Sequence, residues 1–207
     1  MTDRMTVFVV DDEADVRDSL RYLLESADFR VETYASAGDF LDAYTPDTSG
    51  VLVLDLRMAG MSGLELQQAL RAKQYEIPII VLTGHGDVPL AVQAMKDGAM
   101  EFLQKPINDH VLIDCIRNAS RIDEQNRRRK AEHDAILKRI ASLTPRQKQV
   151  MDLVVAGKSS KRIADELCVA VKTIEVHRKF ILAKMKAEST VDLVTMVHPI
   201  RGKRAPR

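Results

Sequence analysis

Short apolar runs alternate with amphipathic stretches over the first 120 residues of the chain. The runs have the length of strands and are Val7–Val10, Val31–Tyr34, Val51–Leu54, Ile77–Leu82 and the weaker Glu101–Leu103. The amphipathic stretches have the spacing of helices and cover residues 14–26, 36–44, 63–73, 88–97 and 109–121. Strands that alternate with helices form a parallel sheet covered on both faces. We therefore predict an α/β fold with a doubly wound, five-stranded parallel sheet.

From Leu143 onward the pattern is helical only. Thr144 as N-cap, Pro145 at the first helical position and Gln147 three residues after the cap form a strong helix start. Gly157 is expected to end this helix. A second helix capped by Ser159 or Ser160, a turn and a third helix should follow over Lys161–Leu167, Cys168–Val171 and Lys172–Met185. Two helices joined by a tight turn predict a helix-turn-helix in an all-α domain.

These patterns divide the chain into four segments. Residues 5–121 form the α/β domain, 122–141 a helical linker with the basic run Arg127–Lys130, and 142–200 the helix-turn-helix domain. Residues 201–207 form a basic tail. We expect the chain to be disordered from Pro199 to its last residue.

Charge is distributed unevenly along the chain. The net charge is only +1, but residues 1–119 hold 10 basic and 20 acidic side chains, whereas residues 143–207 hold 14 basic and 6 acidic ones. A basic half joined to an acidic half suggests two tasks, and the basic half is a candidate binder of a polyanion. A solvated basic surface would give the same count.

Neither the apolar runs nor the cysteines indicate an exported or membrane protein. The runs are far shorter than the roughly 20 residues of a membrane span, and no apolar signal-peptide core precedes the first of them. Cys115 and Cys168 lie in apolar helical patterns. We expect both to be buried thiols in a reducing cytoplasm, with a disulfide or metal pair as the alternative.

Reactive side chains follow the predicted strands. Asp11 and Asp12 come directly after the first strand, Asp55 after the third, and the fourth and fifth end at Thr83 and Lys105. The carboxyl ends of parallel strands meet at one edge of the sheet, where ligands bind. Three carboxylates there would repel one another unless a cation lies between them. A hard divalent ion such as Mg²⁺ (or Mn²⁺) fits this ligand set.

This group of side chains can carry phosphoryl transfer. A carboxylate can act as nucleophile and accept a phosphoryl group as an acyl phosphate. The metal and Lys105 would neutralise charge on the transferred group, while Thr83 donates a hydrogen bond to one of its oxygens. A lone aspartate after a strand is often only a helix cap, but five such residues at the strand ends are much more specific.

The same residues carry a family resemblance. Val9–Glu13, Leu54–Met58, Val81–Gly84 and Phe102–Pro106 resemble the motifs of a two-component receiver domain, which has a flavodoxin-like fold, and the likeness covers residues 5–121. It implies that Asp55 accepts the phosphoryl group from a sensor histidine kinase. It also implies that Asp12 and Asp55 bind the metal directly and that Asp11 binds it through water.

The receiver resemblance has two further consequences and one departure. It implies a cis peptide before Pro106, and Thr83 and Phe102 as the coupled pair that reports phosphorylation to the protein surface. For Phe102 the alternative is simple core packing. Ala59 stands where most receivers have proline.

The third C-terminal helix has a candidate DNA-reading face. Four residues share this face at offsets 0, 3, 4 and 7: Lys172, Glu175, Val176 and Lys179. Three others should form a buried stripe: Ile174, Ile181 and Met185. A helix fits the major groove, so the first face could contact base edges, while Arg178 and Lys184 hold phosphates. A solvated amphipathic helix is the alternative.

This half of the chain also resembles a known module. Thr144–Arg146, Ile163–Leu167, Lys172–Arg178 and Lys184–Met185 are similar to the LuxR-type helix-turn-helix. That likeness implies that Thr173 and His177 contact phosphates. The chain departs from the module at Ala170, where the family commonly has a serine that caps the recognition helix.

A receiver followed by this module resembles the NarL/FixJ family of response regulators, and FixJ-type members most of all. The resemblance implies that phosphorylation of Asp55 drives homodimerisation and binding to a two-fold site in double-stranded DNA. It further implies control, by analogy activation, of transcription, with RNA polymerase as a further partner. Such a protein is no enzyme beyond self-catalysed transfer to Asp55 and hydrolysis from it. The alternative is a Mg²⁺-dependent phosphotransferase or phosphatase that uses the same aspartate.

Overall fold

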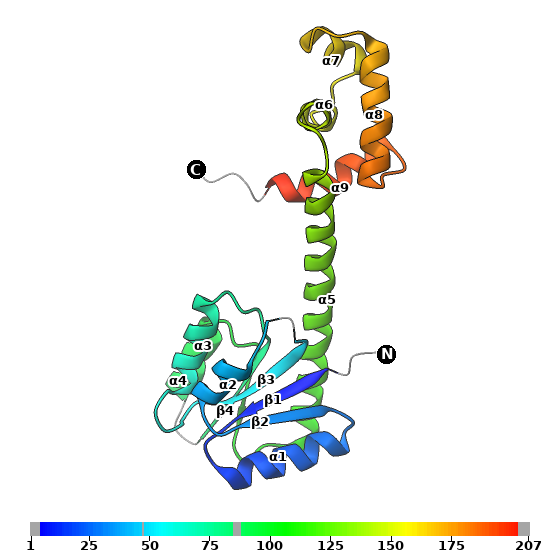
Figure 1. Ribbon diagram of the computed structural model, residues 1–207. Helices are drawn as coiled ribbons and strands as arrows, with labels where there is room; N and C mark the ends of the chain where they lie inside the picture. The colour runs from blue at the N-terminus through cyan, green and yellow to red at the C-terminus, as the bar shows by residue number, and fades with distance from the viewer. Residues whose placement is uncertain (1–4, 47, 85–87, 203–207) are drawn as a thin grey trace. The chain divides into compact units, whose positions relative to one another are not determined.

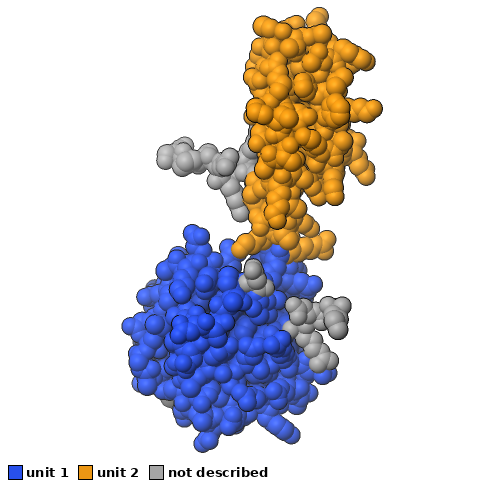
Figure 2. Space-filling view, viewed as in Figure 1, with its two compact units in different colours: residues 1–127 blue, residues 128–207 orange. Residues whose placement is uncertain are grey.

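The structure, a computed structural model, describes residues 5–46, 48–84 and 88–202 (Figure 1). The chain divides into two compact units, residues 1–127 and 128–207 (Figure 2).

The N-terminal unit is built on a parallel sheet. Its strands are β1 (Thr6–Val10), β2 (Arg30–Tyr34), β3 (Gly50–Asp55), β4 (Ile79–Thr83) and β5 (Glu101–Gln104). They lie in the order β2-β1-β3-β4-β5, and all neighbouring pairs are parallel. The predicted doubly wound, five-stranded α/β fold is confirmed.

Two apolar cores lie on opposite faces of this sheet. The helices are α1 (Ala14–Ser26), α2 (Ala37–Ala43), α3 (Gly63–Ala72), α4 (Val88–Lys96) and α5 (Asp109–Ala141). Because side chains alternate along a strand, Phe8 and Val10 of β1 pack with α2, α3 and α4. Val7 and Val9 pack instead with α1 and α5 on the other face. Helices on both faces bury the three central strands, β1, β3 and β4, completely, which explains their nearly continuous apolar runs.

Helix α5 continues through the expected helical linker, as the helical pattern of residues 122–141 predicts. One helix covers the expected fifth helix of the α/β domain and the whole expected linker. The N-terminal unit holds this helix beyond residue 121 through Asp123, whose side chain is only 1% exposed. Asp123 Oδ2 accepts hydrogen bonds from Ser49 Oγ (2.8 Å) and Arg127 Nε (2.9 Å). Arg127 also donates to the carbonyl oxygens of Pro46 and Thr48.

The C-terminal unit is helical, as predicted. After the end of α5 it contains α6 (Pro145–Val155), α7 (Ser160–Glu166), α8 (Val171–Met185) and α9 (Thr190–Gly202). Thr144 and Gln147 form the expected capping box of α6, and Ser159 caps α7. Helix α9 reaches into the expected disordered tail, whereas residues 203–207 lie outside the described residues.

The expectation of two buried cysteines is wrong. Cys168 is exposed, and Cys115 is half-buried; both are free thiols. Helix α7 ends at Glu166, and Cys168 adopts a φ of 51° in the turn that leads to α8. Cys168 thus lies outside both helices in a left-handed backbone conformation, and it is exposed there. In the part of the chain that the structure describes, no helix is long and apolar enough to cross a bilayer.

Replacing Asp123 by alanine should destabilise the N-terminal unit by about 3 kcal/mol, because the change leaves a half-buried guanidinium and a serine hydroxyl without their acceptor. Tyrosine fluorescence during urea unfolding measures this unit alone, since all four tyrosines lie between residues 22 and 75 and the chain has no tryptophan. The matched control is Asp114→Ala on the same helix, where the carboxylate is exposed; it should change the free energy of unfolding by less than about 0.5 kcal/mol. Equal effects of the two substitutions would show that Asp123 does not anchor α5.

Candidate functional site

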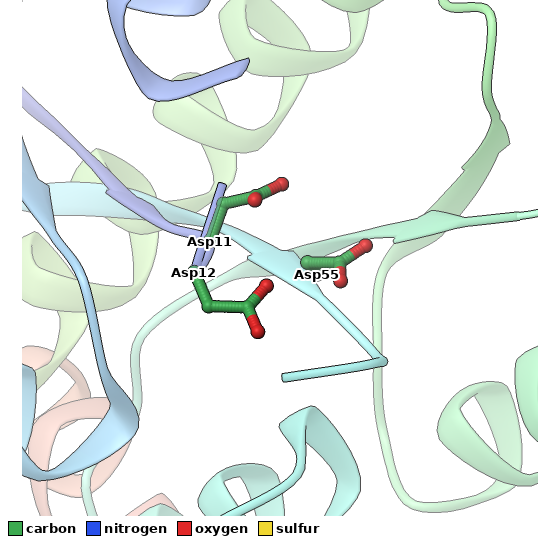
Figure 3. A group of neighbouring side chains, drawn as sticks. All are labelled: Asp11, Asp12 and Asp55. Carbon is green, nitrogen blue, oxygen red and sulfur yellow. The ribbon is translucent and has the colours of Figure 1, made fainter. Parts of the chain in front are cut away.

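Three carboxylates gather at the carboxyl edge of the sheet (Figure 3). Asp11 and Asp12 follow β1, and Asp55 is the last residue of β3. One oxygen from each lies within 4.8 Å of the others. Asp11 and Asp55 are buried, while Asp12 is exposed. The structure therefore brings together the acidic residues that the strand pattern placed at this edge.

Lys105 joins two of these carboxylates. Its Nζ lies 2.8 Å from Asp11 Oδ2 and 3.0 Å from Asp55 Oδ1. Burial raises the pKa of Asp55, as does the charge of Asp11, although Lys105 acts in the opposite direction. Burial alone would lower the pKa of Lys105, but its hydrogen bonds to Asp11 and Asp55 outweigh that effect and raise it. The ammonium thus offsets the electrostatic repulsion between the two buried carboxylates.

Backbone amides fix the orientation of the carboxylates. Glu13 N donates to Asp11 Oδ1 at 2.9 Å, and Arg57 N donates to Asp55 Oδ2 at 3.1 Å. Hydrogen bonds from N–H groups to a carboxylate favour its charged form. The two buried carboxylates therefore point into the pocket in fixed positions.

The amide of Ala59 holds the third carboxylate. Ala59 N donates to Asp12 Oδ2 at 2.9 Å. A proline, which most receivers have at this position, has no N–H and could not make this bond. The departure at Ala59 thus gives Asp12 a donor from the loop that follows β3.

Thr83 and Phe102 occupy different environments. Thr83, at the end of β4, is buried, and its hydroxyl donates to Leu103 O at 3.5 Å, the long end of the hydrogen-bond range. Phe102, on β5, is 44% exposed. The alternative of simple core packing for Phe102 is therefore wrong. The peptide between Lys105 and Pro106 is cis, as the receiver resemblance implies.

The donor set of this pocket fits a divalent metal ion. Three carboxylates and one ammonium leave an excess of two negative charges in a partly buried space. Oxygen ligands of this kind, few in number and open to solvent on one side at Asp12, are those that Mg²⁺ uses together with water and phosphate oxygens.

Helix α8 presents the predicted faces. The three residues of the expected apolar stripe are buried: Ile174, Ile181 and Met185. The four residues of the candidate reading face are exposed: Lys172, Glu175, Val176 and Lys179. Thr173, a candidate phosphate contact, is exposed as well. His177 is half-buried. Lys172 Nζ lies 3.5 Å from Glu175 Oε2, so these two opposite charges lie close together one turn apart.

Two expected phosphate contacts have protein partners instead. Arg178 donates to Ser160 Oγ (3.3 Å) and to Thr190 Oγ1 (2.8 Å), and so links α8 to the first residues of α7 and α9. Lys184 donates to Ser142 O (3.0 Å) and to Gln147 Oε1 (3.1 Å). Their role toward phosphates stays a prediction, and contact with DNA would compete with these bonds.

Comparison with protein families identifies both units. Residues 7–117 match the response regulator receiver domain, and residues 141–197 match the luxR family of bacterial regulatory proteins. The chain is a response regulator. Its second domain is of the LuxR DNA-binding type, which confirms the resemblance inferred from the two sets of motifs.

Similar proteins align with this chain over most of their length. The transcriptional regulatory protein FixJ of Rhizobium meliloti is 47% identical over 95% of this chain and 96% of its own. FixJ of Bradyrhizobium diazoefficiens is 45% identical over 95% of this chain and 96% of its own. The transcriptional regulatory protein TdiR of Thauera aromatica is 46% identical over 93% of this chain and 85% of its own. This response regulator is therefore similar to FixJ-type transcriptional regulators.

Solved structures agree with this assignment. The response regulator StyR matches with a TM-score of 0.87 and 44% identity over 95% of this chain and 99% of its own. Full-length FixJ from B. japonicum matches with a TM-score of 0.59 and 44% identity over 99% and 100%.

Sequence reasoning missed one exposed residue of the response regulator's recognition helix. Phe180 of α8 is 55% exposed and lies four residues after Val176, which is also exposed. Residues at this spacing are neighbours on a helix surface. The spacing was the available signal, but a phenylalanine inside a helical pattern is more often a core residue.

Replacing Lys105 by methionine should tighten Mg²⁺ binding about tenfold, because removing a positive charge a few ångströms from the carboxylates strengthens their attraction for a cation. Isothermal titration calorimetry at pH 8 measures the dissociation constant. Lys96→Met, which removes an exposed ammonium from α4, is the matched control and should leave it unchanged. Equal or weaker binding by the Lys105 variant would contradict the proposed charge balance.

Replacing Ala170 by serine should stabilise the C-terminal unit by about 1 kcal/mol, the usual value of an N-cap. Ala170 already has the extended backbone of an N-cap but no side-chain acceptor. The change in the free energy of unfolding can be followed by far-UV circular dichroism. The same substitution at the exposed Ala183, within α8, should be slightly destabilising, because alanine is the better helix former. Stabilisation at both positions would rule out capping as the cause.

Proposed function

We propose that this response regulator accepts a phosphoryl group on Asp55 from a sensor histidine kinase and thereby controls its own binding to DNA. The observation that carries the proposal is the lysine-bridged pair of buried carboxylates, Asp11 and Asp55, beside the exposed Asp12. Such a site concentrates a nucleophile, a counter-charge and ligands for a cation in one place.

In this proposal a carboxylate oxygen of Asp55 attacks the phosphorus of phosphohistidine. The phosphorus–nitrogen bond breaks, and Asp55 becomes an acyl phosphate. Asp12 and Asp55 would hold Mg²⁺ (or Mn²⁺) directly and Asp11 through water; a bound divalent ion neutralises charge on the phosphoryl oxygens. Lys105 balances the remaining charge, and its place between Asp11 and Asp55 positions it for this role.

The long hydrogen bond of Thr83 supports its role as the switch. Its hydroxyl can leave Leu103 O at little cost and donate to a phosphoryl oxygen on Asp55. Phe102, the neighbour of Leu103 on β5, would then turn from its exposed position toward the space beside Thr83. Phosphorylation would in this way reshape the surface of α4 and β5.

That surface has the composition of a protein contact. Val88, Val92 and Met95 lie along one side of α4 at offsets 0, 4 and 7, and all three are exposed, as is Phe102 on the neighbouring β5. We propose that two phosphorylated chains pair through this face in an isologous dimer. A dimer would present two copies of α8 to a two-fold site in double-stranded DNA.

On DNA, Lys172, Glu175, Val176 and Lys179 would contact base edges, and Thr173 and His177 would contact phosphates. By analogy with FixJ-type regulators the outcome is activation of transcription, with RNA polymerase as a further partner. The metabolite phosphatase alternative would need a second substrate-binding domain, and residues 141–197 match the luxR family instead.

Acetyl phosphate with Mg²⁺ should raise both the molecular mass and the DNA affinity of the wild-type chain. Light scattering and a mobility-shift assay with a promoter-derived duplex measure the two effects. Asp55→Asn keeps the size of the side chain but removes the nucleophile, and it should abolish both responses. No response in the wild type would contradict the proposal.

Val92→Glu separates phosphorylation from dimerisation. The glutamate would place a charge on the proposed contact at an exposed position of α4, so the chain should still accept the phosphoryl group and remain a monomer. Val111→Glu, at an exposed position of α5, is the matched control and should still dimerise. Dimerisation of the Val92 variant would place the interface elsewhere.

A further inference from the structure

The described part of the C-terminal unit exposes five large apolar side chains, and three of them belong to α8. The five are Leu137, Val171, Val176, Phe180 and Val191. Val176 and Phe180 are 45% and 55% exposed. They lie four residues apart and so form a continuous apolar patch on the helix surface.

Charged residues surround this patch. Lys179 precedes Phe180 directly, and Lys172 and Glu175 lie about one turn before Val176 and Lys179, all of them exposed. Residues 143–207 carry 14 basic and 6 acidic side chains. An apolar protein partner would have to desolvate these charges, whereas a polyanion would be attracted by the net positive charge of this region. The occupant that fits both the patch and its surroundings is duplex DNA.

DNA offers one apolar group in its major groove, the C5-methyl of thymine. Phe180 is four residues after Val176, a candidate base contact, and seven residues after Thr173, a candidate phosphate contact. It therefore lies at the border between the base-facing and the backbone-facing sides of α8. The thymine methyl is likewise at the outer edge of its base, next to the backbone of its own strand.

We propose that Phe180 determines sequence specificity by packing against a thymine methyl about two base pairs from the one that Val176 contacts. The rise of 1.5 Å per residue separates the two side chains by about 6 Å along the helix, roughly two base-pair steps. This assignment rests on the proposed DNA-binding function. It adds an apolar contact to a reading face that is otherwise mostly charged.

The test compares DNA with and without the methyl group. A pool of random duplexes is enriched by binding to the acetyl-phosphate-treated, full-length protein and is then amplified with either thymidine or deoxyuridine triphosphate. The wild type should bind the thymine form more tightly, by about fourfold for each methyl that it buries. Phe180→Ala should lose a large part of this preference, while Phe180→Leu should retain more of it.

The control substitution is Val191→Ala, which removes an exposed apolar side chain from α9 and should leave the preference at the wild-type value. Because Phe180 is exposed, its substitution should not unfold the domain, and circular dichroism checks this. A Phe180→Ala variant that keeps the full wild-type preference for the thymine duplex would overturn the inference. So would a Phe180→Ala variant whose molecular mass changes while its preference for thymine does not. If the wild type binds neither duplex form at low salt, the proposed DNA-binding function fails, and this inference falls with it.

Discussion

Lys105 places one positive charge between two buried carboxylates, and the carboxyl edge of the sheet depends on this contact. The lysine follows β5, yet it reaches past β4 to Asp55 at the end of β3 and to Asp11 after β1. Burying both acids without it would be costly. One cation does not neutralise the whole cluster, so the pocket retains affinity for a second one. The interaction that stabilises this edge therefore also leaves the pocket with the charge that the proposed phosphoryl transfer requires.

The placement of the pocket residues could be predicted because a buried strand fixes the position of the residue that follows it. Asp11, Asp55 and Thr83 each come at the end of an apolar run, and the topology of parallel strands then brings them to one edge. The sequence could not reveal that Lys105 contacts Asp11 as well as Asp55. That choice depends on the path of the chain after β5, which carries no periodic signal.

Some polar side chains have partners that the local sequence pattern does not reveal. Arg127 belongs to a basic run that looks like a solvated linker, but Asp123 and the loop around Ser49 hold it. Arg178, a predicted phosphate contact, also links three helices through Ser160 and Thr190. Local patterns predict helices well, because caps and spacing are local. They do not show which polar side chain a distant element will engage.

The amide of Ala59 matters for anyone who wishes to engineer this regulator. Proline at this position would match the common receiver sequence, and such consensus changes usually stabilise a loop by restricting the unfolded chain. Here the same change would remove the N–H that holds Asp12 at the exposed side of the pocket. A screen for thermal stability alone would select this substitution without detecting that Asp12 has lost its hydrogen-bond donor. Consensus design in this loop should therefore score the carboxylate geometry together with the melting temperature.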